Sequence, residues 1–186
     1  MCAEIHPVVV RTEVLILQHP QEPDKDLGTA RLLHLALPNS SLKIGLSWPN
    51  LQKVTGRPVN PKEWGVLYLG SKVKQTFEKS MQDRISYLDG KGDPLSNEVP
   101  LRGLVVLDGT WSQAKTLWWR NPWLLKLQRL VLIPAQRSLY GSLRKEPRRE
   151  CVSTLEAVGA VLSVIERNSE IKTQLNKILE KLLSRF

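Results

Sequence analysis

The stretch Gly103-Leu-Val-Val-Leu-Asp-Gly-Thr-Trp-Ser-Gln-Ala114 joins a short apolar run directly to a polar turn and a helical pattern. The run from Gly103 to Leu107 has no polar alternation, which is typical of a strand in a parallel sheet covered on both faces. Thr110 and Gln113 have the spacing of a capping box, so a helix is predicted to begin right after the turn. A buried strand followed at once by a helix predicts an α/β fold with a mostly parallel sheet.

The rest of the chain alternates strand and helix patterns in the same way. Short apolar runs predict further strands at 13–19, 43–48, 65–69 and 130–133. Apolar residues at helical spacing predict helices at 27–37, 153–165 and 170–186. The polar segment 72–101 contains glycines and prolines, so we expect a helix fragment followed by a loop. We therefore expect a single domain over residues 1–186, with helices flanking the sheet.

The composition excludes several classes of protein. In a chain of 186 residues, 41% hydrophobic and 24% charged residues are ordinary for a globular fold and unlike a disordered chain. No apolar run approaches the roughly 18 residues of a membrane span, and the N-terminus lacks a signal-peptide pattern. Cys2 and Cys151 are too few for a disulfide framework or a four-thiolate zinc site. We expect a cytoplasmic globular protein.

The positive charge is concentrated in one segment. The chain carries a net charge of +9, and residues 111–150 contain nine basic against two acidic residues, or +7 of that total. A basic surface attracts polyanions through counterion release, and nucleic acid is the usual partner. The alternative is a solvated basic face on an ordinary enzyme.

The strongest candidate for a functional residue is Asp108. Ligands of open α/β sheets bind beyond the carboxyl ends of the strands, and Asp108 lies at such an end. Gly109 permits the tight turn, and the free N–H groups of the following helical turn face the same crevice. Capping alone explains Thr110. Asp108 can also interact with the helix dipole, but its position directs it toward the expected ligand.

Four motifs in register resemble one protein family. The heptapeptide from Asp108 to Ala114 resembles the signature of the DTW-domain family, and the resemblance covers roughly residues 13–167. The other matching stretches are His19-Pro20 with Glu22, Tyr140 with Arg144-Lys145-Glu146-Pro147, and Ser153-Thr154-Leu155-Glu156-Ala157. The family is that of the tRNA-uridine aminocarboxypropyltransferases, which are related to the SPOUT class of S-adenosylmethionine-dependent enzymes.

The resemblance implies a specific reaction and fold. N3 of a uridine in tRNA attacks the γ-carbon of the methionine part of S-adenosylmethionine, and 5′-methylthioadenosine leaves. The SPOUT relatives imply a SPOUT-like fold with a trefoil knot near the C-terminus. Such knots are very rare, and nothing in the periodicity of this chain suggests one.

The chain departs from the family pattern at two places. Many members carry an N-terminal cysteine cluster typical of a zinc site, whereas this chain has only Cys2 there, so we expect no metal. Where members often have Tyr-Pro-Gly after a central strand, this chain has Tyr68-Leu69-Gly70. The first departure leaves open how tRNA is held at that end.

The motifs and the sheet position together define the candidate site. Asp108 is the catalytic candidate, either as general base for the uridine imide or as partner of the ammonium group of S-adenosylmethionine. The candidates for binding S-adenosylmethionine are Tyr68, Gly70, Asp108, Thr110, Trp111, Ser153, Thr154 and Glu156. The candidates for binding RNA are His19, Arg144, Lys145, Arg148 and Arg149.

Other interpretations of these residues remain. A capping box alone explains Ser153 and Glu156. Arg144 and Arg149 have the chemistry to clamp the donor carboxylate, to bind phosphates or simply to carry surface charge. Trp111 can stack on adenine or belong to the core. In the tryptophan-rich stretch 118–123, core packing is expected for most rings, while one exposed ring could stack on a base.

The expected function is transfer of the aminocarboxypropyl group to uridine N3 in tRNA. A SPOUT-like RNA methyltransferase and a non-catalytic RNA-binding domain are the alternatives. Asp108, Thr110, Trp111 and Glu156 together argue against the second, because RNA binding alone requires none of them. The sequence leaves open which uridine is modified and whether the chain is a monomer or a homodimer. We expect no association with a membrane.

Overall fold

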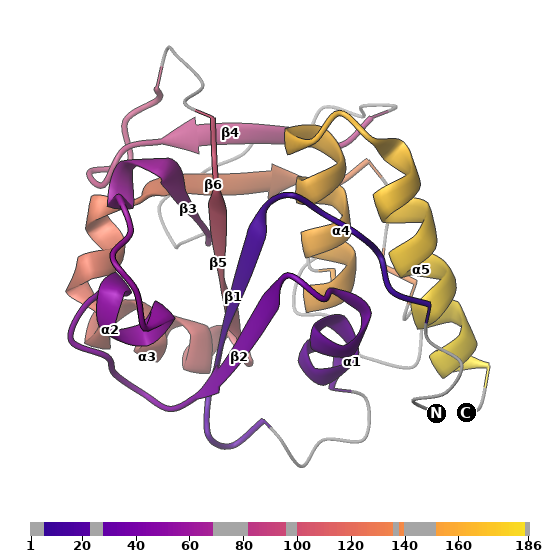
Figure 1. Ribbon diagram of the computed structural model, residues 1–186, viewed down its shortest axis with the longest axis horizontal. Helices are drawn as coiled ribbons and strands as arrows, with labels where there is room; N and C mark the ends of the chain where they lie inside the picture. Colours follow the sequence, from indigo (N-terminus) through magenta and orange to yellow (C-terminus); the bar gives the residue numbers. More distant parts are fainter. Residues whose placement is uncertain are drawn as a thin grey trace.

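The computed structural model describes residues 6–22, 28–68, 82–95, 100–135, 138–139 and 152–184. Within them, six strands form one sheet in the order β2-β1-β5-β3-β6-β4 (Figure 1). The strands are β1 (Glu13–Gln18), β2 (Ser40–Ile44), β3 (Trp64–Leu67), β4 (Arg84–Leu88), β5 (Gly103–Asp108) and β6 (Gln128–Ile133). Neighbouring strands are parallel except β4 and β6, which are antiparallel. The prediction of an α/β fold with a mostly parallel sheet is confirmed.

Helices cover both faces of the sheet. They are α1 (Thr29–Ala36), α2 (Leu51–Thr55), α3 (Trp111–Arg120), α4 (Thr154–Ile165) and α5 (Ser169–Leu183), with two 3₁₀ turns, η2 (Pro61–Glu63) and η3 (Pro122–Lys126). Figure 1 shows α1, α4 and α5 on one side of the sheet and α2 and α3 on the other. The side chains of β5 alternate between the two faces. Leu104 and Val106 pack with residues of α1, α4 and α5, whereas Val105 packs with residues of α2 and η3.

Two sequence predictions were wrong. In the segment 72–101, the expected loop is wrong at Arg84–Leu88, which forms the strand β4. The helix fragment expected earlier in that segment is not tested, because 69–81 lies outside the described residues. β4 is a half-buried edge strand whose partner is β6, so long-range pairing rather than a local pattern defines it. The strand expected at 43–48 is β2 at Ser40–Ile44, because the register with β1 begins at Ser40.

Gly103 fixes the start of β5. It lies opposite Trp64 in the parallel pair of β5 and β3. A Cβ at Gly103 would stand 2.3 Å from ring atoms of Trp64, a distance that packed atoms do not tolerate. The absence of a side chain therefore lets the tryptophan ring lie across β5. This contact helps to set the register that carries Asp108 to the carboxyl edge of the sheet.

Candidate functional site

Asp108 lies at the carboxyl edge of the sheet and connects three elements. It ends β5, and Gln18, its partner in the parallel register, ends β1. Gln18 Nε2 donates to Asp108 Oδ2 at 2.9 Å, and the Thr154 hydroxyl, from the first turn of α4, donates to Asp108 Oδ1 at 2.5 Å. Asp108 is 7% exposed, so its carboxylate is held in place and largely shielded from water. The structure thus joins Asp108 to Thr154, two of the predicted site residues.

The turn after Asp108 leads directly into the predicted helix, α3, whose N-cap is Thr110. Gly109 has φ +154°, and a Cβ there would stand 2.9 Å from Gln113 Cβ, so the close approach requires glycine. Thr110 N–H donates to Gln113 Oε1 at 2.7 Å, and Gln113 N–H donates to Thr110 Oγ1 at 3.4 Å. The predicted capping box is confirmed. The Thr110 side chain is occupied in starting α3 directly beside Asp108.

A second capping box begins α4 at the same edge. The Ser153 hydroxyl accepts from Glu156 N–H at 3.2 Å, and Ser153 N–H donates to Glu156 Oε2 at 2.9 Å. The buried carboxylate of Glu156 also accepts from the Ser138 hydroxyl at 2.8 Å and from Leu139 N–H at 2.6 Å. Glu156 therefore does more than cap a helix, because it holds residues 138–139 against α4.

The two helix starts give the edge its electrostatic character. The first turns of α3 and α4 both lie beside Asp108, one through Gly109 and the other through Thr154. The N-terminus of a helix carries partial positive charge and favours an anionic group. The Asp108 carboxylate adds a full negative charge beside them. The edge therefore suits a ligand that carries both a carboxylate and a cationic group.

His19 lies inside this edge. Its backbone N–H donates to the carbonyl of Asp108 at 3.0 Å, which continues the pairing of β1 with β5 past the last strand residues. His19 is 9% exposed, and its Nδ1 accepts from Gln21 N–H at 3.3 Å. The Gln21 side chain in turn accepts from Gln113 Nε2 at 3.4 Å. As a candidate for binding RNA, His19 is thus placed at the edge of the Asp108 site and is largely covered.

Tyr68 lies on the other side of the sheet from the Asp108 contacts. Its ring stacks on Trp118 of α3, with ring centroids 4.5 Å apart and an interplanar angle of 18°. The Arg129 guanidinium lies 5.6 Å from the Tyr68 ring centroid, and Arg129 Nε donates to the Tyr68 carbonyl at 3.1 Å. Burial raises the pKa of the Tyr68 phenol, and the charge of Arg129 partly opposes this. Burial likewise lowers the pKa of Arg129.

The remaining predicted site residues are only partly placed. Trp111 begins α3 and is 36% exposed. Several predicted residues lie outside the described part of the chain, namely Gly70, Arg144, Lys145, Arg148 and Arg149, as do Cys2, Tyr140 and Cys151. Gln18 is the site residue that sequence reasoning missed. The signal that could have found it is the expectation that two adjacent parallel strands end at the same edge.

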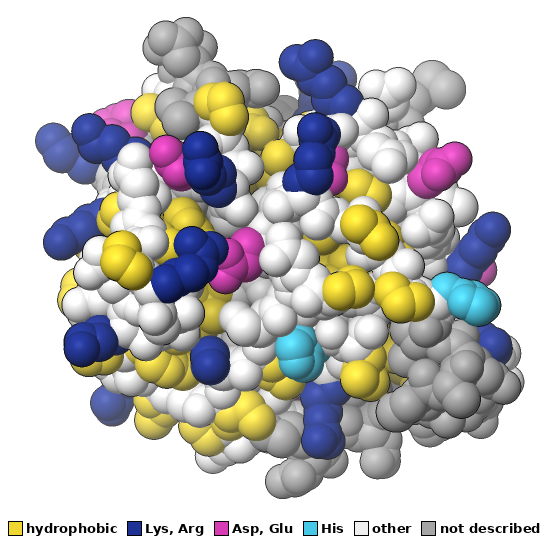
Figure 2. Space-filling view, in the orientation of Figure 1, with side chains coloured by type: hydrophobic (Ala, Val, Ile, Leu, Met, Phe, Trp, Pro, Cys, Tyr) yellow, Lys and Arg dark blue, Asp and Glu magenta, His cyan; other side chains and the backbone are white. Residues whose placement is uncertain are grey.

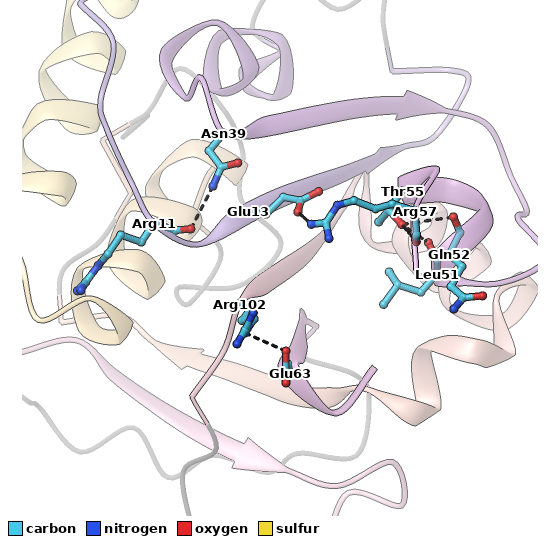
Figure 3. A network of polar contacts seen from close by, with 9 residues as sticks. All are labelled: Arg11, Glu13, Asn39, Leu51, Gln52, Thr55, Arg57, Glu63 and Arg102. Carbon is cyan, nitrogen blue, oxygen red and sulfur yellow. Dashed lines mark hydrogen bonds and ion pairs between the residues drawn. The ribbon is translucent and has the colours of Figure 1, made fainter. Parts of the chain in front are cut away.

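A cavity of about 760 Å³ opens at the opposite edge of the sheet, where β1 and β5 begin. Four arginines line it: Arg11, Arg57, Arg102 and Arg167. Figure 3 shows the pairs that Arg57 forms with Glu13 and Arg102 with Glu63, the latter at 3.0 Å. Arg11 lies 3.8 Å from Glu166. Three of these four arginines have a carboxylate partner, and the cavity lies at the end of β5 opposite Asp108.

On the face shown in Figure 2, most acidic side chains lie beside a basic one. Within the described ranges, no three histidine, cysteine, aspartate or glutamate side chains gather as a metal site would require. Across those same ranges, no helix combines the length and the apolar character needed to cross a membrane.

Comparisons with known proteins agree with the motifs. The family model of the DTW domain matches residues 1–186. The chain is 29% identical to tRNA-uridine aminocarboxypropyltransferase 2 of Macaca fascicularis, over 96% of this chain and 56% of the relative. It is 30% identical to the enzyme of that name from Drosophila melanogaster, over 95% of this chain and 65% of the relative.

A more distant relative is tRNA-uridine aminocarboxypropyltransferase A of Arabidopsis thaliana, which is 28% identical over 95% of this chain and 71% of its own length. The chain spans little more than half the length of the mammalian relatives it matches. No solved structure matches it.

Proposed function

Because this chain belongs to the DTW-domain family, we propose that it is a tRNA-modifying transferase that moves the 3-amino-3-carboxypropyl group of S-adenosylmethionine to N3 of a uridine. The observation that carries the proposal is the hydrogen bond from Thr154 to Asp108. It joins two of the motifs on which the resemblance rests, although 46 residues separate them in the chain. Together with the helix starts, these motifs build one polar edge.

The proposed reaction balances without an added reagent. Uridine N3 gives up its proton and forms a bond to the γ-carbon of the donor. The bond between that carbon and the sulfonium sulfur breaks, and its electron pair stays on sulfur, so neutral 5′-methylthioadenosine leaves. The positive sulfur of the donor makes the γ-carbon electrophilic. The protein has to orient the two substrates and accept the proton.

Asp108 is the group proposed to accept that proton. Its Oδ2 accepts a hydrogen bond from Gln18 and its Oδ1 accepts one from Thr154, and these bonds fix the orientation of the carboxylate. A general base must lie within hydrogen-bond reach of the proton that it removes. Asp108 ends β5 at the carboxyl edge of the sheet, so a uridine bound beyond the strand ends would lie next to this carboxylate.

The same edge fits the amino-acid part of S-adenosylmethionine. Gln18 is 1% exposed, and among the described residues no donor reaches its Oε1. This oxygen and the Asp108 carboxylate are acceptors suited to an ammonium group. The partial positive charge at the starts of α3 and α4 suits a carboxylate. The residues present therefore fit a donor that carries both groups.

The other predicted roles belong to this proposal. Tyr68, Gly70, Thr110, Trp111, Ser153, Thr154 and Glu156 would line or shape the donor site, and His19, Arg144, Lys145, Arg148 and Arg149 would contact tRNA. The reaction needs no metal. A SPOUT-like fold with a trefoil knot remains a prediction from the resemblance, and a cytoplasmic location remains a prediction from the composition.

The leaving group tests the proposal. The protein is incubated with unmodified tRNA and S-adenosylmethionine, and the nucleoside product of the donor is identified by chromatography. We expect 5′-methylthioadenosine, which forms only when the γ-carbon is attacked. Accumulation of S-adenosylhomocysteine would identify a methyltransferase instead. Binding of tRNA without either product would indicate a non-catalytic RNA-binding domain.

A further inference from the structure

The outward side of α3 carries an exposed tryptophan among basic residues. Trp119 is 71% exposed, and Lys115, four residues earlier, is also exposed. Residues four apart lie on the same side of a helix, so Lys115 lies between Trp119 and Trp111 along one stripe. Leu117, which is fully buried, faces the core from the other side of α3. Lys115, Trp119 and the exposed Arg120 are called the α3 face below.

The end of α3 that carries Trp119 is firmly anchored. Asn121 is fully buried, and its Nδ2 donates to the carbonyls of Leu46 at 3.0 Å and Leu117 at 2.8 Å. Its Oδ1 accepts from Trp48 N–H at 2.8 Å and from Trp123 Nε1 at 3.2 Å. Both the oxygen and the nitrogen of the Asn121 side-chain amide are hydrogen-bonded, so the backbone at the end of α3, next to Trp119, is held in place. A ring presented from a rigid base loses little conformational entropy when it binds a partner.

The basic residues around the Trp119 ring indicate which kind of partner this surface binds. Residues 111–126 include Lys115, Arg120 and Lys126 and contain no aspartate or glutamate. Aromatic rings interleaved with basic side chains are the features with which proteins bind single-stranded nucleic acid, the rings stacking on bases and the cations contacting phosphates. A protein-docking face would instead carry an apolar core depleted of lysine. The surface therefore complements RNA better than protein.

We propose that the α3 face is a single-stranded RNA-binding surface on which Trp119 stacks a base of a nucleotide near the target uridine. The proposal rests on the proposed function for the identity of the RNA. α3 begins directly after the Asp108 turn, and at about 1.5 Å per residue Trp119 lies roughly 12 Å along the helix axis from Trp111. RNA that enters the Asp108 site can thus extend along α3. Lys115 lies between the two rings, where a phosphate of that strand would pass.

Four variants distinguish three contributions to RNA binding: stacking of the Trp119 ring on a base, the positive charge of Lys115, and the loss of an exposed apolar side chain. Trp119→Leu keeps an apolar side chain but removes the aromatic face, and Trp119→Tyr restores an aromatic ring. Lys115→Gln removes one positive charge. Leu35→Ala is the matched control, because Leu35 is an apolar side chain that is 52% exposed on α1. All three positions are exposed, so circular dichroism should show the same fold in each of the four variants.

Binding is measured without the donor, by filter retention of oligouridylate and of an unmodified tRNA transcript over a range of salt concentrations. We expect Trp119→Leu to weaken binding of both by about five- to 100-fold with an unchanged salt slope, because stacking releases no counterions. Trp119→Tyr should recover most of the affinity. Lys115→Gln should reduce the magnitude of the salt slope by about 0.7, the value for one phosphate contact in a single strand. Leu35→Ala should bind as the unchanged protein does.

Binding of both RNAs by Trp119→Leu with the affinity of the unchanged protein would overturn the proposal. If that variant also sediments as a smaller species, the α3 face is an interface between two copies of this chain. Because no donor is present, this test is separate from the test of the reaction. Trp119-dependent RNA binding by a protein that releases no 5′-methylthioadenosine would overturn the proposed activity and support the RNA-binding surface.

Discussion

At the scale of single residues, Asp108 has two possible roles that kinetics can separate. Asp108→Asn keeps the shape of the side chain and removes its charge and basicity. If Asp108 is the general base, kcat should fall by about 10²–10⁴-fold while donor affinity changes little. If it mainly holds the ammonium group, donor affinity should fall and turnover should recover at saturating donor.

Thr154→Val is the control for Asp108→Asn. It removes the hydrogen bond to Asp108 Oδ1 and leaves the carboxylate in place, so its effect on kcat should be smaller. Both variants are measured by steady-state kinetics after their thermal unfolding has been checked. A fall in kcat of less than about tenfold for Asp108→Asn would exclude Asp108 as the base.

Tyr68 gives a second prediction at this scale. Burial raises its pKa above the ordinary 10.0, so the neutral phenol is favoured in the folded protein. The resulting contribution to stability is complete below pH 10 and is lost as the pH rises through the raised pKa. In an ultraviolet difference titration against Tyr68→Phe, Tyr68 should ionise above its ordinary pKa. Arg129→Met should raise that pKa further, and a pKa at or below 10.0 would contradict the observed burial.

At the scale of elements, the two capping boxes differ in burial. Ser153 is 2% exposed and starts α4, whereas Thr110 is exposed and its bond from Gln113 N–H is a long 3.4 Å. Ser153→Ala should lower the free energy of unfolding by about 0.5–2 kcal/mol, near the upper end of that range, and Thr110→Ala should lower it by less. Urea denaturation measures both. A larger loss of unfolding free energy for Thr110→Ala than for Ser153→Ala would contradict the view that the start of α4, with Glu156, contributes more to stability than the start of α3.

Locally encoded elements were predictable from the sequence, and elements made by long-range pairing were not. β5, the Gly109 turn and α3 follow one another, so the apolar run and the spacing of Thr110 and Gln113 were sufficient. β4 pairs with β6, and the paired residues lie more than 40 residues apart in the chain. The sequence of β4, RISYL, has no continuous apolar run that would predict a strand. Gln18 meets Asp108 across 90 residues and belongs to no motif, so only the expectation that adjacent parallel strands end at the same edge could have pointed to it.

At the scale of the whole molecule, the two edges of the parallel strands differ in electrostatics. At the carboxyl edge, two helix starts and a buried carboxylate lie side by side. At the amino edge, arginines face a cavity but are mostly paired with glutamates. A parallel sheet places its helix starts beyond the carboxyl ends of its strands, and this topology supports the proposal that the reaction occurs at the carboxyl edge. The DTW motif thus lies where the fold offers a ligand site.

The most direct test of the account uses two isotopic forms of S-adenosylmethionine, one labelled in the carboxyl carbon and one in the methyl carbon. Each is incubated with the protein and unmodified tRNA, the tRNA is digested, and its nucleosides are analysed by mass spectrometry, with Asp108→Asn as the control. The account predicts that the carboxyl label appears on the base of a uridine, that the methyl label does not, and that Asp108→Asn incorporates far less. Transfer of the methyl label alone, or of neither label, would contradict it.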